Sequence, residues 1–222
     1  MRSVSETKNV SRPIRTGVVG LGRAGWKIHA APLGAMPARF EIAGVCDPDA
    51  SRCAEASAQL LCPAHQDLDG ILRDPDIELV VVASPSHLHT EQSLAAIAEG
   101  KHVVCEKPFA LSAEDADRTI EAAEAAGVVV APFQNRRYEP HFRKVLELVR
   151  SGELGEVLQI RICWHRFSRR WDWQAMRRFG GGVLFNNGAH LIDQALDLVD
   201  DPEPELFLTC VGACRWATRR ST

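Results

Sequence analysis

The chain has 222 residues, of which 45% are hydrophobic and 25% charged, and its formal net charge is -3 at pH 7. This length is enough to bury a substantial core in one or two globular domains. The slightly acidic balance argues against a nucleic-acid-binding surface, and no apolar run approaches the roughly 18 residues that a membrane-spanning helix requires.

The first segment, residues 1–12, is polar and lacks the hydrophobic stretch of a signal peptide. It is therefore predicted to be a disordered tail. The seven cysteines are odd in number and scattered, and the CxxxC spacing of Cys210 and Cys214 is not that of a zinc or redox motif. We expect reduced thiols in a cytoplasmic protein, without a metal site.

From residue 13 to residue 132, short β-branched runs alternate with segments of helical periodicity. This alternation is typical of a parallel sheet covered by helices on both faces. The predicted strands are residues 16–19, 41–46, 79–83, 102–105 and 128–131, and the predicted helices are residues 24–35, 50–61, 68–73, 90–99 and 113–126. The fold class is therefore α/β, and residues 13–132 are predicted to form a doubly wound parallel sheet of the Rossmann type.

Three residues mark the ends of these helices. Ser112, three positions before Asp115, predicts the start of the last helix, because a serine side chain in this position accepts a hydrogen bond from the first turn. Gly100 and Gly127 follow predicted helices, where a left-handed cap is expected.

Residues 133–222 have a different sequence pattern, which predicts a second α/β domain. An apolar stripe of Phe142, Val145, Leu146 and Val149 indicates a helix that ends before Gly152. Residues 158–164 and 206–211 are predicted strands, and residues 189–199 a helix. Because two strands are too few for a stable open sheet, we expect either a truncated domain or one that another chain completes.

The most informative motif is Gly-Leu-Gly-Arg-Ala-Gly at residues 20–25, between the first predicted strand and helix. In this GxGxxG pattern the first glycine permits the tight turn. The second lets the backbone approach a pyrophosphate, and the third allows close helix packing. The phosphates would lie at the helix start, beside Arg23 and Ala24. The alternative interpretation is an ordinary βα turn.

Asp47 ends the second predicted strand, 22 positions after Gly25 (47 minus 25). At this distance from the glycine motif, a carboxylate is expected to accept hydrogen bonds from the adenosine ribose. A negative charge there disfavours a 2'-phosphate. The sequence therefore predicts NAD as cofactor in preference to NADP.

Four segments together resemble the Gfo/Idh/MocA family of oxidoreductases. They are GLGRAG at 20–25, SPSHLH at 84–89, GKHVVCEKP at 100–108 and GGVLFNNGAHLID at 181–193. The resemblance implies a Rossmann domain followed by an α/β domain whose open sheet forms a substrate pocket on one face and commonly an oligomer interface on the other. Members typically oxidise a sugar or polyol hydroxyl, or reduce a carbonyl, with NAD(P).

Lys107 follows a predicted buried strand at its carboxyl end, where ligands bind in open α/β sheets. The family carries its active lysine in this Glu-Lys-Pro motif, which implies that Lys107 hydrogen-bonds the reacting oxygen and that Glu106 lies beside the cofactor and orients the lysine. The alternative interpretation is that Lys107 is only a charged loop residue before Pro108.

His190 is the candidate general acid or base, because an ordinary imidazole titrates near ~6.5. The family motif has an aspartate four residues before this histidine, but the present chain has Asn186, which cannot accept a proton. Asn187 is a candidate substrate contact. Asp193, one helical turn after His190, is either its partner or a helix acid that pairs with an arginine, and the second interpretation is favoured. His190 itself is alternatively a structural residue.

Ser84, Pro85 and His89 resemble the family segment beside the nicotinamide ribose, although Ser86 replaces its usual asparagine. An equally open interpretation is that the histidines of this segment only cap the following helix. Arg137 is a candidate substrate residue at the predicted domain junction. Trp173 belongs to an Arg- and Trp-rich stretch, with Arg170 and Arg178, that either lines a pocket or lies on the surface.

The sequence leads to one main hypothesis and two rivals. The main hypothesis is a hydride transfer between NAD and a polyhydroxylated small molecule such as a sugar or inositol, by a homo-oligomer assembled through the second-domain sheet. The first rival is a catalytically impaired NAD-binding regulatory module. The second is an NAD-assisted glycosidase that oxidises a sugar transiently.

Overall fold

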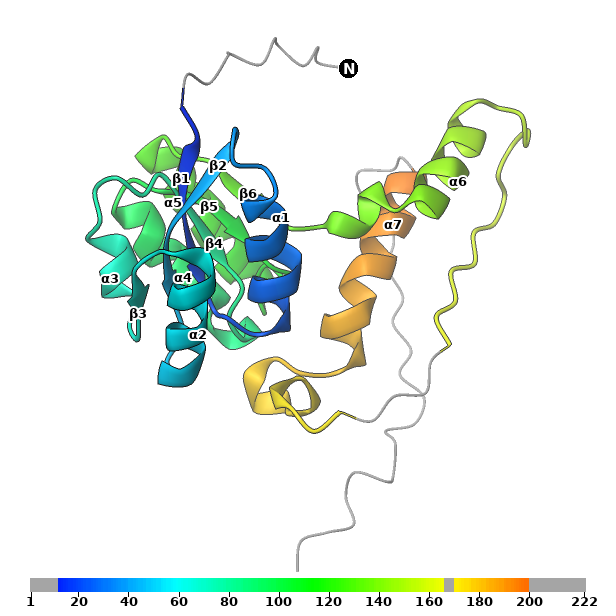
Figure 1. Ribbon diagram of the computed structural model, residues 1–222. Coiled ribbons are helices and arrows are strands. Elements are labelled where there is room, and N and C mark those ends of the chain that lie inside the picture. Colours follow the sequence, from blue (N-terminus) through cyan, green and yellow to red (C-terminus); the bar gives the residue numbers. More distant parts are fainter. Residues whose placement is uncertain (1–11, 166–169, 200–222) are drawn as a thin grey trace, which may run out of the picture.

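The computed structural model describes residues 12–165 and 170–199. Six parallel strands form one sheet in the order β3-β2-β1-β4-β5-β6 (Figure 1). Because this is the strand order of a doubly wound Rossmann sheet, the predicted fold class is confirmed. The strands are β1 Ile14–Val19, β2 Phe40–Cys46, β3 Ala64–His65, β4 Leu79–Val82, β5 His102–Cys105 and β6 Val130–Pro132.

The helices between these strands follow the predicted segments closely. They are η1 Ala24–Ala30, which has π-type hydrogen bonds, α1 Ala31–Gly34, α2 Ala50–Leu60, α3 Asp69–Leu72, η2 Ser86–Leu88, α4 His89–Ala98 and α5 Ala113–Ala126. The Ser112 side chain accepts a hydrogen bond from the Asp115 amide at 3.1 Å, and Gly127 adopts a φ of 67°. Both predicted caps of α5 are therefore confirmed.

The core lies on both faces of the sheet. In β4, the side chains of Val80 and Val82 pack into one apolar cluster, whereas Val81 packs into the cluster on the other face. Because neither face is exposed to water, the central strands are continuous apolar runs. This packing fixes the carboxyl ends of β1, β4 and β5 side by side at the same end of the sheet.

The later elements lie apart from the sheet, and α6 Pro140–Arg150 and α7 Ala189–Val199 pack against each other (Figure 1). Both helices were predicted. Short turns of other helix types accompany them. η3 Asn135–Tyr138 precedes α6, and η4 Trp173–Ala175, η5 Arg177–Phe179 and η6 Leu184–Gly188 lie between α6 and α7.

The predicted strand at residues 158–164 is wrong, because this segment is extended but pairs with no strand in the described part of the chain. Its alternation is nevertheless present: Ile160, Ile162 and Trp164 are half-buried, whereas Arg161 and Cys163 are exposed. A period of two predicts which side chains share a face, but it does not provide a pairing partner. The other predicted strand, residues 206–211, and most of the predicted tail lie outside the described residues.

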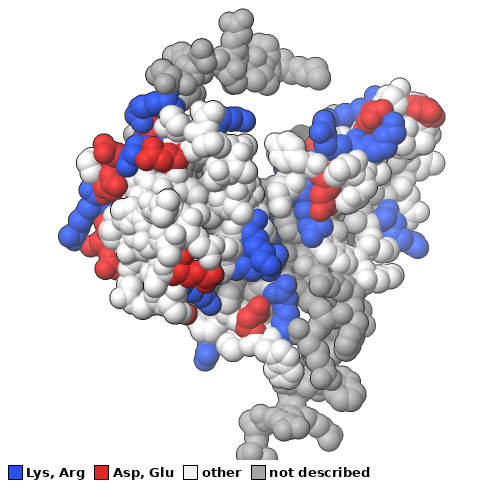
Figure 2. All heavy atoms as spheres, viewed as in Figure 1, with Lys and Arg blue, Asp and Glu red and all other residues white. Residues whose placement is uncertain are grey.

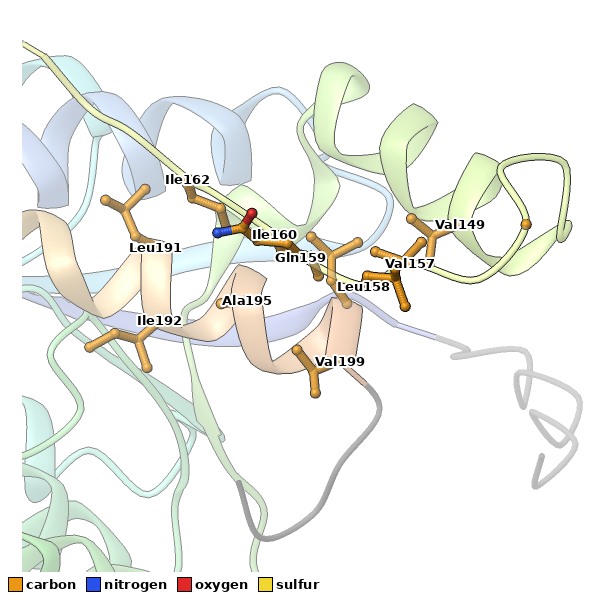
Figure 3. A pocket seen from close by; sticks show the side chains of 12 residues that line it. Val149, Val157, Leu158, Gln159, Ile160, Ile162, Leu191, Ile192, Ala195 and Val199 are labelled. Atoms are coloured by element: carbon orange, nitrogen blue, oxygen red, sulfur yellow. The ribbon is translucent and has the colours of Figure 1, made fainter. Parts of the chain in front are cut away.

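An apolar groove of about 690 Å³ separates this extended segment from α7 (Figure 3). Ile160 and Ile162 line it from the extended segment, and Leu191, Ala195 and Val199 line it from the helix. The half-buried face of residues 158–164 and the apolar face of α7 therefore border the same hollow.

Two further observations apply to residues 12–165 and 170–199. None of their helices is long and apolar enough to cross a bilayer. They also contain no group of three or more His, Cys, Asp or Glu side chains suited to a metal ion.

Leu61 offers a test of backbone strain, because it ends α2 with a φ of 54° and its side chain is 89% exposed. An L-residue is strained in this region, whereas glycine is not. We predict that Leu61→Gly raises the free energy of unfolding by about 0.5–1 kcal/mol in urea titrations. Leu61→Ala, which removes the same side chain but keeps the Cβ, is expected to change it little; equal stabilisation by both variants would contradict the explanation.

Candidate active site

The glycine motif makes a tight corner between β1 and η1. Gly20 has a φ of 89°, and a Cβ atom there would lie 2.6 Å from the amide nitrogen of Ser84. A Cβ atom at Gly25 would collide with the carbonyl oxygen of Gly20, whereas one at Gly22 would meet nothing within 4 Å. The first and third glycines are therefore required by the chain's own packing, and the space beside Gly22 is open to a ligand.

Asp47 lies at the end of β2, where its side chain is buried, with 3% of the residue exposed. Its Oδ2 accepts a hydrogen bond from the Leu21 amide at 2.8 Å, and its Oδ1 accepts one from the Asp49 amide at 2.9 Å. Arg52 Nη1 lies 3.3 Å from Oδ2. The carboxylate thus ties the glycine corner to β2, and the adjoining hollow of about 280 Å³ is lined by Gly22, Arg23, Trp26, Lys27 and Glu55 as well as Arg52.

Lys107 follows β5 and reaches across to η6. Its Nζ donates hydrogen bonds to the backbone oxygen of Asn186 at 2.9 Å and to the Asn186 Oδ1 at 3.0 Å. Burial lowers the pKa of Lys107, and the nearby charge of Glu106 opposes this effect. The ammonium is held between two segments that are 79 positions apart in the sequence.

Glu106 is buried and is hydrogen-bonded on both oxygens. Its Oε1 lies 3.1 Å from His29 Nε2, and its Oε2 accepts the Lys107 amide at 3.2 Å. Burial acts to raise the pKa of Glu106, but the hydrogen bond and charge of His29, with the charge of Lys107, hold it below its ordinary value. Sequence reasoning missed His29, although its position four residues after Gly25 places it one turn along the same helix face.

His190 begins the first turn of α7, and only 5% of the residue is exposed. Its Nδ1 has no hydrogen-bond partner among the described residues. Burial, with the charges of Lys107 and Arg136, lowers the pKa of His190 to about 4. The imidazole is therefore neutral near pH 7, with its proton-accepting nitrogen free of a proton, but it is a weaker base than the ordinary imidazole assumed from sequence.

Asp193 forms a bidentate ion pair with Arg137. Arg137 Nε and Nη2 donate to the two carboxylate oxygens at 2.8 and 2.6 Å. The expectation that Asp193 pairs with an arginine is confirmed. This pair links η3 to α7, and His190 does not have Asp193 as a hydrogen-bond partner.

His89 is almost completely buried and lies between two loops. Its Nδ1 is 2.7 Å from the oxygen of Pro108, and its Nε2 is 2.9 Å from the oxygen of Ser84. Burial lowers the pKa of His89, and a neutral imidazole can donate to only one of these carbonyls. The ring connects the loop after β4 to the loop that carries Lys107.

One cavity of about 160 Å³ brings most of these residues together. The candidate residues from the sequence that line it are Arg23, Ala24, Ser84, His89, Glu106, Lys107, Trp173, Asn186, Asn187 and His190. Further lining residues are Ile28, Ala83, Asn135, Arg136, Arg170 and Gln174. Gly20, Gly22, Gly25, Asp47, Pro85, Arg137 and Asp193 do not line it.

Comparison with known proteins agrees with this geometry. A family model described as an oxidoreductase family with an NAD-binding Rossmann fold matches residues 14–134, and the GFO/IDH/MocA C-terminal domain matches residues 142–209. The chain belongs to the Gfo/Idh/MocA family of oxidoreductases.

Three members of the family illustrate the similarity. The chain is 36% identical to the uncharacterized oxidoreductase C115.03 of Schizosaccharomyces pombe, covering 86% of this chain and 53% of the relative. It is 32% identical to the scyllo-inositol 2-dehydrogenase (NADP(+)) IolW of Bacillus subtilis, and the match covers 86% of this chain and 53% of the relative. The structure of the WlbA dehydrogenase from Bordetella pertussis with NADH and UDP-GlcNAcA matches with a TM-score of 0.73 at 28% identity, covering 85% of this chain and 56% of that one. The chain spans about half the length of the curated relatives it matches.

One of the departures from the family motif lies directly beside Lys107. Asn186 occupies the position where the family motif led us to expect an aspartate, and its amide oxygen accepts from Lys107. The asparagine keeps the geometry of the contact but supplies no negative charge. Among the described residues that line the cavity, Glu106 is the only one with a carboxylate.

The glycine corner gives a matched pair of variants. We predict that Gly25→Ala lowers the free energy of unfolding by more than about 2 kcal/mol, because η1 must move away from β1. Gly22→Ala should unfold like the parent in urea but bind NADH roughly tenfold more weakly, since its methyl group enters the open space. Unchanged NADH affinity in Gly22→Ala would contradict the placement of the pyrophosphate.

Proposed function

We propose that this protein transfers a hydride between NAD and a hydroxyl or carbonyl group of a sugar, an inositol or a related polyol. The observation that carries the proposal is the Lys107 ammonium, held by Asn186 in a cavity that His190 and the glycine-corner residue Arg23 also line. When bound, the nicotinamide supplies the hydride acceptor or donor. Apart from Arg137 and Asp193, which pair with each other and do not line the cavity, the site residues predicted from sequence keep their proposed roles.

The coenzyme fits the residues present at the glycine corner. The open space beside Gly22 and the start of η1 suit a pyrophosphate, because unpaired helix amides and the helix dipole favour negative charge. Gly20 and Gly25 shape this corner, and Arg23 and Ala24 border it. Ser84, Pro85, His89 and Glu106 form the segments beside the nicotinamide half.

Lys107 and His190 divide the chemistry in this proposal. Lys107 donates a hydrogen bond to the reacting oxygen and stabilises negative charge as the carbon loses its hydride. His190 accepts the hydroxyl proton, as its neutral state at physiological pH permits. Asn186 positions Lys107, while Trp173 and Asn187 contact the substrate. Arg137 and Asp193 do not line the cavity, and their ion pair instead joins η3 to α7.

NAD is proposed over NADP because the Asp47 carboxylate lies at the end of β2, beside the hollow proposed for the adenosine. Arg52 partly balances this charge, so the preference is expected to be moderate. The ratio of kcat/KM for NAD and NADP in one assay measures it, and a ratio below one would reverse the assignment.

We further propose that residues 13–132 and 133–222 form two domains, and that the protein is cytoplasmic and forms a homo-oligomer through the second-domain sheet where that sheet is complete. Light scattering coupled to size exclusion tests the assembly. A compact monomer at micromolar concentration would contradict it.

A second function is favoured by one observation. Asn186 removes the acid expected near His190, so a dinucleotide-binding regulatory module without turnover is the alternative. Tight NAD binding with no NADH formation across sugars and inositols would select it.

Lys107→Met tests the proposed catalytic role. The methionine keeps the length of the side chain but cannot donate a hydrogen bond, so we expect kcat to fall roughly 10²–10³-fold. NADH absorbance with a panel of sugars and inositols measures turnover, and NAD affinity should change little. Lys144→Met, at an exposed position on α6, is the control; activity of Lys107→Met equal to the parent would refute the assignment.

Asn186→Asp tests the electrostatics of the pair. A carboxylate in place of the amide that lies 3.0 Å from Lys107 Nζ raises the pKa of Lys107 and favours the protonated form of His190. We therefore predict that the acid limb of the kcat/KM profile, expected near the His190 pKa of about 4 in the parent, moves to higher pH. If the acid limb of the profile does not move, that limb does not report the titration of His190. His190→Gln should abolish the acid limb.

A further inference from the structure

The cavity around Lys107 is lined mainly by cationic charge. Arg23, Lys107, Arg136 and Arg170 all border it, against the one carboxylate of Glu106. Glu106 is already hydrogen-bonded to His29 and to the Lys107 amide. Figure 2 shows Lys and Arg side chains gathered where the Rossmann sheet and its helices face the later segments. With Arg23 assigned to the coenzyme phosphates, three cations remain for the substrate.

The acids that accompany two of these cations do not line the cavity. Arg136 Nη1 lies 2.9 Å from Glu139, and Arg170 Nη1 lies 3.4 Å from Asp172. Each guanidinium has five N–H donors, and these contacts use few of them. The Arg136 guanidinium also stacks on the ring of Trp164, 4.3 Å from its centre. The arginines are therefore positioned from outside the cavity, with donors left for a ligand.

Two buried polar atoms of lining residues have no partner within the described ranges. They are Nδ1 of His190 and Oε1 of Gln174. Buried polar atoms in native proteins are normally hydrogen-bonded, and one left without a partner costs about 1–3 kcal/mol. Both residues thus belong to the cavity wall without a complete set of hydrogen bonds from the described part of the chain.

The cations also act on one another. Arg170, Arg23 and Arg136 add to burial in lowering the pKa of Lys107, and Lys107 and Arg136 do the same for His190. An anion placed among these groups would relieve their repulsion, whereas a neutral polyol would leave it unchanged.

We propose that the substrate carries a carboxylate or phosphate group besides its hydroxyls, and that Arg136 and Arg170 bind this anionic group. This inference rests on the proposed function and narrows its substrate class from neutral polyols to acidic ones. Asn186 supports it, because an aspartate at this position would return a negative charge to the cavity wall.

Matched ligand pairs test the proposal by binding alone. Glucose is compared with glucuronate and glucose 6-phosphate, galactose with galacturonate, and myo-inositol with its 1-phosphate, each titrated into the protein with and without saturating NADH. We expect at least one acidic ligand to bind about tenfold or more tightly than its neutral partner. The pairs also separate carboxylate from phosphate as the preferred anion.

Arg170→Gln should abolish most of this preference, because glutamine carries no positive charge, and the ratio of affinities within each ligand pair measures the loss. Arg178→Gln is the control, because Arg178 stacks on Phe179 and does not line the cavity. Equal affinities within every pair, no binding of any ligand, or an Arg170→Gln variant that keeps the full preference would overturn the proposal. Failure of NADH to bind would instead refute the proposed function. The preference for acidic ligands is then still measured by the titrations without NADH.

Discussion

The close approach of η1 to β1 at Gly25 is the contact on which the geometry of the site depends. Only a residue without a side chain lets the helix lie against the Gly20 carbonyl, and this places His29, one turn along, beside Glu106. Glu106 then receives the Lys107 amide, and Lys107 extends to Asn186. A packing constraint in the first βα unit is thus transmitted through the buried contact between His29 and Glu106 to the proposed catalytic ammonium.

The charges around the cavity act on both proposed catalytic groups. Burial lowers the pKa of Lys107 and the pKa of His190, and neighbouring cations lower both further. The negative charge of Glu106 opposes this effect at both groups. Asn186 leaves this balance unchanged, because it accepts a hydrogen bond from the lysine without adding charge.

Much of the fold was predictable because its signals are local. The strands of the doubly wound sheet are continuous apolar runs, and α5 begins and ends at residues with clear capping chemistry, Ser112 and Gly127. The strand predicted at residues 158–164 failed because a strand requires a partner, which alternation alone does not supply. β3, with two residues, is too short to produce any period.

The site was predictable where a motif fixes both residue and position, as for Lys107 and the glycine corner. His29, Arg136 and Gln174 were not assigned roles, because their contacts depend on how distant segments meet, and no local pattern encodes that. The low pKa of His190 has the same origin: it follows first from burial and then from the charges of Lys107, in the loop after β5, and Arg136, in η3.

The central claim is that the coenzyme binds at the glycine corner with its nicotinamide beside Lys107. Lysine acetylation, quantified by mass spectrometry with and without saturating NADH, tests it most directly. The account predicts that NADH protects Lys107 strongly while Lys144, exposed on α6, is labelled equally in both conditions. Equal labelling of Lys107 with and without NADH would contradict the account.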